Sequence, residues 1–206
     1  MDQRITDFTG VILAAGSSRR MGRPKPLLGI EGDIFINRIL SNLSAAGLTR
    51  ILIVLGEHAG DVRSALGGKI KAGIVINPSP ERGQLSSIQM ALDQLDRSTT
   101  GILLVLVDHP LVRSETYRKI LETAGEDPDL IIIPNFNGRN GHPVYFGKRF
   151  FGELKNAPLD QGARYVVNKY RSEVIAVPVD DDGILKDIDD PELYRKYISG
   201  VSNGTG

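Results

Sequence analysis

A group of residues suited to phosphate binding directly follows the first apolar run of the chain. The run, residues 11–15, is followed by a segment, 16–25, that holds two glycines, two serines, three arginines and a lysine. Glycines let the backbone approach a ligand closely, and consecutive N–H groups with nearby cations form a concavity that binds anions. The segment therefore predicts a triphosphate-binding loop at the end of a buried strand, with an ordinary solvated basic loop as the alternative.

Two well-known phosphate loops do not fit this segment. The pattern G-x-G-x-x-G is absent, and the Gly-Lys-Ser/Thr ending of a P-loop is replaced by Gly22-Arg23-Pro24-Lys25. The sequence thus favours neither a Rossmann dehydrogenase nor a P-loop nucleotide hydrolase.

A carboxylate lies at the end of another apolar run. Residues 102–107 carry no charge and lead directly into Asp108-His109-Pro110. Ligands of open α/β sheets bind at the carboxyl ends of the strands, and Mg²⁺ takes oxygen ligands that commonly include one or two carboxylates. We therefore predict that Asp108 binds Mg²⁺, with an Asp that only stabilises a turn or caps the next helix as the alternative. His109 is predicted to be a loop residue rather than a base.

Polar groups also gather at the start of a predicted helix. Asn77 precedes the stretch 82–88, in which Gly83 comes before Ser86 and Ser87. Helix N-termini bind anionic and polar groups through their free N–H groups. This arrangement predicts ligand contacts at the helix start, with ordinary helix capping as the alternative.

Apolar runs rich in β-branched residues alternate with segments of helical periodicity. This alternation predicts an α/β fold, a single domain with a mainly parallel, Rossmann-like sheet and helices on both faces. The predicted strands are 11–15, 51–55, 74–76, 102–107, 130–133, 144–146 and 174–177. The predicted helices are 34–46, 62–66, 84–95, 114–124, 162–170 and 191–198, with Ser114 and Asp190 as N-caps of two of them. Residues 135–141 are predicted to be a polar loop and 199–206 a flexible tail.

The composition limits the classes of partner. The 206 residues include 25 basic and 25 acidic ones and no cysteine. A formal net charge of zero argues against nucleic acid as a partner, and the lack of cysteine excludes disulfides, thiol nucleophiles and cysteine-bound metals. No apolar run has the length of a membrane span, and no signal-peptide core follows Met1. A single cytoplasmic domain over residues 1–206 is expected.

Together the motifs resemble a known enzyme superfamily. The pattern L-A-A-G-x-S-x-R-M-G-x-P-K, read over residues 13–25, is similar to the signature of nucleotidyltransferases of the glycosyltransferase-A-like superfamily, especially the molybdenum cofactor cytidylyltransferases. Gly-Gln-Leu-Ser-Ser, Asp-His-Pro, Gly-His-Pro, Asp-Gln-Gly-Ala-Arg and a closing acidic element extend the resemblance over nearly the whole chain. The resemblance implies a fold of the nucleotide-diphospho-sugar transferase type and Mg²⁺ as cofactor.

The resemblance also implies roles for single residues. Lys25, Arg19 and Asp108 would be catalytic. Nucleotide binding is implied for Leu13, Ala14, Ala15, Gly16, Ser18, Arg19, Gly22, Lys25, Asn77, Gly83, Ser86 and Ser87. Acceptor binding is implied for Gly141, His142, Pro143, Asp160 and Arg164. The closing element adds Asp187 and Asp189 as metal ligands beside Asp108, with a solvated acidic surface as the alternative.

The implied reaction joins an NTP to a phosphate-bearing acceptor and releases pyrophosphate, which requires positioning and charge neutralisation rather than a protein nucleophile. Ala15 stands where guanylyl relatives have glycine, so CTP and a molybdopterin-type acceptor are preferred, with handover to a molybdoenzyme or its chaperone. A sugar phosphate or other acceptor with another NTP is the alternative enzyme. A nucleotide- or cofactor-binding regulator without turnover is an alternative of another class, but the presence of both Lys25 and Asp108 favours the enzyme.

Overall fold

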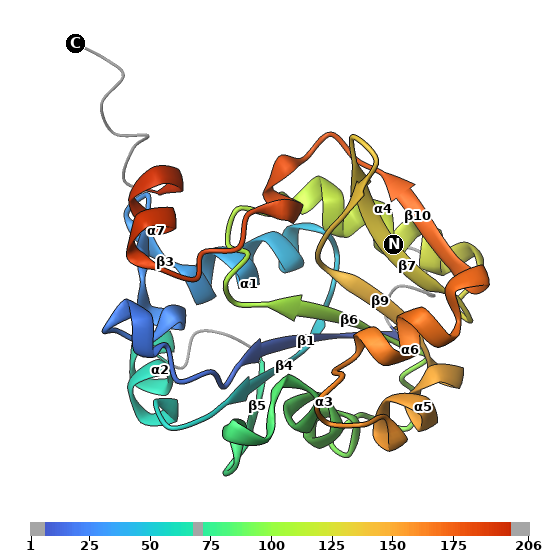
Figure 1. Cartoon of the computed structure of the whole chain (residues 1–206), viewed down its shortest axis with the longest axis horizontal. Helices are drawn as coiled ribbons and strands as arrows, with labels where there is room; N and C mark the ends of the chain where they lie inside the picture. The colour runs from blue at the N-terminus through green and yellow to red at the C-terminus, as the bar shows by residue number, and fades with distance from the viewer. Residues whose placement is uncertain (1–6, 68–71, 199–206) are drawn as a thin grey trace.

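The computed structural model describes residues 7–67 and 72–198, which build one α/β fold (Figure 1). The strand order of the main sheet is β10-β7-β9-β6-β1-β4-β5, and β8 pairs with β7 at the side. β9 is antiparallel to β6 and β7, whereas the other neighbouring pairs along this order are parallel. The strands are β1 Phe8–Ala14, β4 Arg50–Leu55, β5 Gly73–Ile76, β6 Gly101–Leu106, β7 Ile131–Phe136, β8 Arg139–Asn140, β9 Val144–Gly147 and β10 Val174–Pro178. The prediction of a mainly parallel sheet is confirmed.

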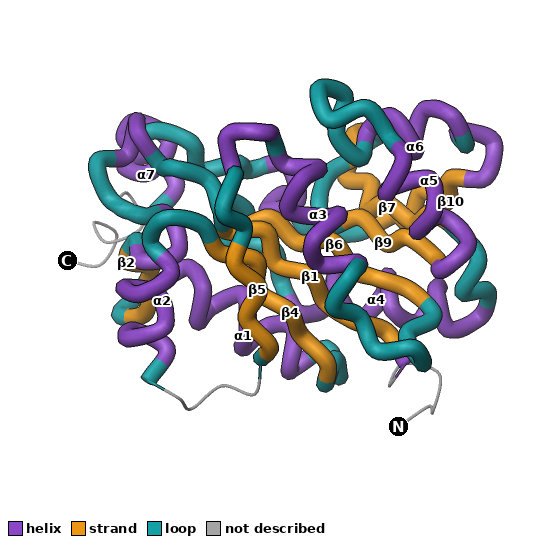
Figure 2. The backbone as a smooth tube through the Cα atoms, turned by 90° about the horizontal axis from the view of Figure 1, so that it is seen from below, coloured by secondary structure: helices purple, strands orange, loops and turns teal. Residues whose placement is uncertain are grey.

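Helices cover both faces of this sheet. One face packs against α1 (Phe35–Ala45), α2 (Ala59–Leu66) and α4 (Ser114–Glu126), the other against α3 (Gln84–Leu92), α5 (Phe151–Asn156) and α6 (Arg164–Lys169). In β1, Ile12 and Ala14 belong to the first core, while Val11 and Leu13 belong to the second. Figure 1 shows α1 and α4 on one side of the strands and α3 and α5 on the other, and Figure 2 shows the strands as one twisted layer. A strand buried on both faces is apolar without alternation, which is the pattern that predicted it.

The C-terminal helix α7 (Pro191–Tyr197) packs beside a two-stranded hairpin of β2 (Gly29–Ile30) and β3 (Asp33–Ile34). The Tyr194 hydroxyl donates a hydrogen bond to the carbonyl of Gly29 at 2.8 Å. A small third core, made of Leu28, Ile30, Phe35, Ile188 and Ile198, fills the space between them. This third core joins the chain that follows the predicted phosphate loop to the acidic segment near the C-terminus.

The seven predicted strands and six predicted helices are present, with their ends shifted by up to a few residues. The sequence did not predict α5, the short hairpin β2–β3, or the 3-10 turns. Residues 135–141, predicted to be a loop, instead contain the end of β7 and all of β8, joined by a tight turn in which Asn137 and Gly138 have positive φ. The predicted tail, 199–206, lies outside the described residues. Within the described part of the chain, no helix combines the length and apolar character needed to cross a bilayer.

The two N-cap predictions had different outcomes. Ser114 is not the N-cap of α4, because Arg113 holds that position and the buried carboxylate of Asp181 accepts hydrogen bonds from Arg113 N at 2.9 Å and Thr116 Oγ1 at 2.6 Å. Asp190 is the N-cap of α7, as predicted. Its side chain accepts hydrogen bonds from the backbone N of Glu192 and of Leu193, the two residues after Pro191. The start of α4 is therefore held by a carboxylate distant in sequence, without a capping hydrogen bond from a local side chain.

Candidate functional site

A cavity of about 410 Å³ opens at the carboxyl ends of β1 and β6, which are adjacent parallel strands (Figure 1). Its wall comes from the loop after β1, the start of α3, the turn after β6 and the segment before α7. The end of β1 and this loop contribute six of the predicted nucleotide-binding residues: Leu13, Ala14, Ala15, Gly16, Ser18 and Lys25. Segments far apart in the sequence thus meet where an open α/β sheet binds its ligands.

Two residues with left-handed backbone conformations shape the loop after β1. Ser18, with φ of 49°, and Gly22, with φ of 64°, flank the 3-10 turn η2 (Arg19–Met21). Ser18 Oγ also accepts a hydrogen bond from the backbone N of Lys25 at 2.9 Å, just before the 3-10 turn η3 (Lys25–Leu27). The chain therefore folds back on itself and returns Lys25 to the cavity. Gly22 provides the turn but does not line the cavity.

Of the two adjacent arginines of η2, the structure describes the side chain of Arg20 but not that of Arg19. Arg20 lines the cavity. The side chain of Arg19, the predicted catalytic arginine, lies outside the described residues, so its role stays a prediction. The sequence analysis counted Arg20 among the cations of the triphosphate loop but assigned the catalytic role to Arg19, although the pattern L-A-A-G-x-S-x-R-M-G-x-P-K has its arginine at residue 20.

Gly56, which directly follows β4, packs against the start of this loop. A Cβ at Gly56 would lie 2.5 Å from the carbonyl oxygen of Ala15. Since the backbone must move to relieve such a contact, Gly56→Ala is expected to cost about 1–3 kcal/mol of stability and to weaken nucleotide binding. Thermal unfolding and nucleotide titration measure both effects. Gly60→Ala in α2, where a Cβ meets nothing within 4 Å, is the matched control. It is expected to lower neither the stability nor the affinity for nucleotide. Wild-type stability and binding in Gly56→Ala would contradict this role.

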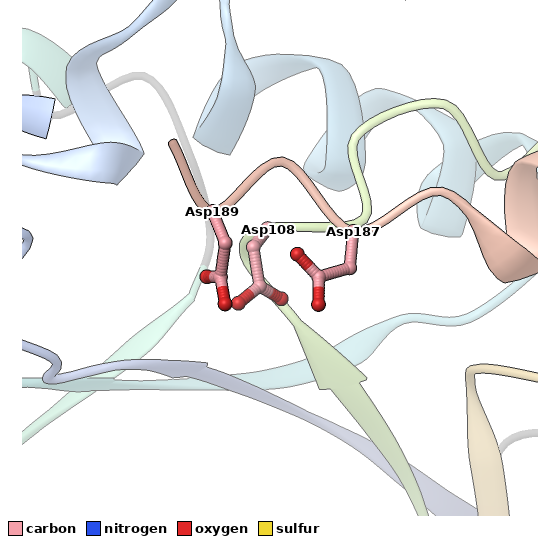
Figure 3. A group of neighbouring side chains, drawn as sticks. All are labelled: Asp108, Asp187 and Asp189. Carbon is pink, nitrogen blue, oxygen red and sulfur yellow. The ribbon is translucent and has the colours of Figure 1, made fainter. Parts of the chain in front are cut away.

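Three carboxylates, those of Asp108, Asp187 and Asp189, form the acidic cluster of the site (Figure 3). One oxygen from each lies within 4.8 Å of the other two. The backbone N of Ile188 donates to the carbonyl of Asp108 at 2.8 Å, and the Ile188 side chain is fully buried in the third core. Ile188 is thereby fixed beside Asp108, and Figure 3 shows Asp187 and Asp189 on either side of Asp108.

Lys25 connects the loop to the acidic cluster. Its Nζ lies 3.1 Å from Oδ2 of Asp108 and also contacts Oδ1 of Asp189. Burial by itself would lower the pKa of Lys25, but Asp108 and Asp189 outweigh that effect and raise the pKa. Burial would raise the pKa of Asp189, but the hydrogen bond and charge of Lys25, with the charge of Arg20, lower it. Lys25 and Asp189 are therefore both ionised at neutral pH.

The acidic cluster has the charge and the donor atoms of a divalent cation site. Oδ1 of Asp108 is buried and has no hydrogen-bond partner among the described residues. Burial, together with the charges of Asp189 and Asp108, raises the pKa of Asp187. Three carboxylates and the one ammonium that contacts them leave two negative charges when all are ionised, which a divalent ion would balance through the oxygen ligands that Mg²⁺ and Mn²⁺ prefer. Asp108, Asp187 and Asp189, the predicted ligand set, therefore fit such an ion.

The predicted polar group at the start of α3 divides into two layers. Gly83 and Ser87 line the cavity. Asn77, which is 2% exposed, donates to Oγ of Ser86 and of Ser87, both at 2.9 Å, and Ser86 Oγ donates to the carbonyl of Gly83 at 2.7 Å. Asn77 and Ser86 therefore lie behind the cavity wall, where they hold Gly83 and Ser87 in position.

The first group of predicted acceptor residues, Gly141, His142 and Pro143, does not line the cavity. The ring of His142 lies 5.1 Å from that of His109, the residue after Asp108. Burial, with the nearby His109, lowers the pKa of His142 to about 4. His142 is therefore neutral at pH 7 and would meet an acceptor through hydrogen bonds rather than as a cation. His109 lies in the turn after β6, as predicted, but its side chain is buried.

The second predicted acceptor group adjoins the start of α3. Asp160 is in the turn before α6, Arg164 is the first residue of that helix, and both are exposed. The carbonyl of Leu159 would lie 3.4 Å from a Cβ at Gly83, which lines the cavity. An acceptor role for Asp160 and Arg164, and for the group around His142, stays a prediction.

The order and content of these motifs decide the family. Residues 10–174 match the model described as the MobA-like NTP transferase domain. The chain belongs to this family. The predicted resemblance to MobA-like nucleotidyltransferases is thereby confirmed.

Relatives of this MobA-like domain match it over nearly its whole length. It is 29% identical over 201 residues to the purine catabolism protein PucB of Bacillus subtilis. The aligned region covers 94% of this chain and 97% of PucB. It is 26% identical over 184 residues to the molybdenum cofactor cytidylyltransferase of Escherichia coli. That aligned region covers 89% of this chain and 92% of the enzyme. The crystal structure of Rv0371c from Mycobacterium tuberculosis matches with a TM-score of 0.84 and 32% identity over 94% of this chain and 98% of that chain. A manganese complex of Rv0371c matches with a TM-score of 0.79.

The cavity of this MobA-like domain also has lining residues to which the sequence analysis gave no role. They are Ser17, Pro26, Pro80 and Gln84, together with Leu106 and Val107 at the carboxyl end of β6. Gln84 is the first residue of α3 and lies between the predicted Gly83 and Ser87 in sequence. Its place in the Gly-Gln-Leu-Ser-Ser stretch was the signal that could have identified it.

Proposed function

We propose that this MobA-like domain transfers CMP from CTP to a phosphate-bearing acceptor, with a molybdopterin-type molybdenum cofactor as that acceptor, and releases pyrophosphate. The observation that carries the proposal is that Lys25, the glycine-containing loop, and Asp108 and Asp189 of the acidic cluster border one cavity. This arrangement offers N–H groups and a cation for phosphates beside oxygen ligands for a divalent metal, which is what phosphoryl chemistry requires. The similarity to the cytidylyltransferase of Escherichia coli supports the choice of CTP and acceptor.

In this proposal the loop after β1 holds the β- and γ-phosphates through its N–H groups and Lys25, with Arg20 beside them. Gly83 and Ser87 at the start of α3 hold the base and ribose. An oxygen of the acceptor phosphate attacks the α-phosphorus in line, and the bond to the bridging β-phosphate oxygen breaks, so that pyrophosphate leaves with the electron pair. Lys25 stabilises the charge that develops there. A divalent ion bound to the acidic cluster would neutralise charge on the α-phosphate.

The proposal predicts that CTP with Mg²⁺ stabilises the protein more than GTP with Mg²⁺ does. Ala15 lines the cavity, and its Cβ would narrow the space for a base where guanylyl relatives have glycine. Thermal shifts with the four NTPs at equal Mg²⁺ measure the preference. Ala15→Gly is expected to reduce the difference between CTP and GTP. A larger shift with GTP in the wild type would rule out the cytidylyl assignment.

Pyrophosphate release separates the proposed enzyme from its alternatives. Release from CTP that depends on a molybdopterin-type acceptor supports the proposal. Release that depends on a sugar phosphate instead would keep the reaction and change the acceptor. Stabilisation by an NTP and Mg²⁺ without release in the presence of any of these acceptors would favour a nucleotide-binding regulator.

A further inference from the structure

Lys25 holds the position from which a cation would bridge two members of the acidic cluster. Its Nζ lies 3.1 Å from Oδ2 of Asp108 and contacts Oδ1 of Asp189. The same two carboxylates belong to the set whose oxygens lie within 4.8 Å of one another. A divalent ion that bound both carboxylates through these two oxygens would therefore take space that the ammonium occupies.

The side chain of Lys25 can change this arrangement while its backbone stays in place. The backbone N of Lys25 is fixed to Ser18 Oγ, and prolines stand on both sides of it in the sequence. The side chain is 16% exposed and borders the same cavity as the loop glycine Gly16 and Ser17. From one fixed backbone position, the ammonium can contact either the carboxylates or an anion bound by the loop.

We propose that Lys25 is a gate for metal binding. Its ammonium competes with a divalent cation for Asp108 and Asp189, and the phosphates of an incoming nucleotide draw the ammonium away, so that metal and nucleotide bind together. This inference rests on the proposed metal site. Two positive charges about 4 Å apart near a protein surface repel strongly enough to change an affinity by well over tenfold.

The test is a titration of the full chain with Mn²⁺, followed by the electron paramagnetic resonance signal of free Mn²⁺, with and without CTP. Without CTP, Lys25→Met is expected to bind Mn²⁺ about tenfold or more tightly than the wild type does. Adding CTP is expected to tighten Mn²⁺ binding far more in the wild type than in this variant. Lys25→Gln serves as a second variant that removes the charge while keeping a polar side chain.

The matched control removes a positive charge nearby without touching the cluster. Lys186 lies on the same segment as Asp187 and forms an ion pair with Asp182 at 2.7 Å. Lys186→Met is expected to change Mn²⁺ affinity by less than about twofold, because the charge of Lys186 is paired with Asp182 rather than with a proposed ligand. If Lys186→Met and Lys25→Met tightened Mn²⁺ binding equally, the gate would be overturned, because the result would show a general effect of removing a positive charge.

Two further outcomes distinguish the gate from the metal site. Equal Mn²⁺ affinity of the wild type and both Lys25 variants without CTP would overturn the gate and leave the metal site in place. Absence of Mn²⁺ binding in all of these proteins, with or without CTP, would overturn the metal site and the gate with it. Asp108→Asn removes a proposed ligand. Combined with Lys25→Met, it is expected to abolish the tighter Mn²⁺ binding that Lys25→Met alone produces.

Discussion

Lys25→Ala is expected to lower the rate of pyrophosphate release from CTP by about 10²–10³-fold. Negative charge accumulates on the leaving pyrophosphate as its bond to the α-phosphorus breaks, so an ammonium beside it stabilises the transition state more than bound CTP. CTP affinity is therefore expected to fall much less than turnover. Steady-state release of pyrophosphate and a CTP titration on the same preparation measure the two quantities.

The Lys25 variants link this prediction to the proposed gate. Loss of the ammonium should tighten Mn²⁺ binding without nucleotide and still slow turnover, because the phosphates lose their cation. Lys186→Ala, which removes a lysine outside the cavity, is the control and should turn over at the wild-type rate. Unchanged turnover in Lys25→Ala would remove Lys25 from the mechanism.

The fold was largely predictable because its strands are buried on both faces. Such strands are continuous apolar runs, and each helix on the sheet needs an apolar stripe, so both patterns are visible in the sequence. α5 (Phe151–Asn156) escaped prediction; it has one buried residue, Leu154, but α6 is equally short and was predicted, so length and burial alone do not explain the difference. The N-cap of α4 escaped because its partner, Asp181, is distant in the sequence.

The site was predictable to the extent that its parts are local. The loop that follows β1 and the carboxylate that follows β6 can be recognised one segment at a time. The approach of Asp187 and Asp189 to Asp108 depends on the hydrogen bond from Ile188 N and on burial of Ile188, and composition alone made that acidic stretch resemble solvated surface. The separation of Ser87 from the buried Ser86 likewise depends on side-chain orientation in the folded helix.

Asp108→Asn is expected to separate a metal-binding role from a structural one. The backbone carbonyl of Asp108 holds Ile188, and any substitution keeps that carbonyl. Within the described residues, the Asp108 carboxylate accepts a hydrogen bond from Lys25 and none from the start of α4, where Asp181 accepts from Arg113 N and Thr116 Oγ1. The isosteric amide should therefore leave the melting temperature without ligand nearly unchanged. A capping Asp would instead cost about 0.5–2 kcal/mol of stability.

The metal site should respond to Asp108→Asn in the opposite way. The amide lacks the charge with which a carboxylate binds a hard cation, so Mg²⁺-dependent stabilisation by CTP should shrink. Pyrophosphate release should fall further, on the order of 10³-fold, because several kcal/mol of charge stabilisation in the transition state is lost with the metal. Asp182→Asn, an isosteric change at the carboxylate that pairs with Lys186, is the control and should alter neither quantity. A destabilised Asp108→Asn protein with normal activity per folded molecule would overturn the metal assignment, because only a structural carboxylate gives that order of effects.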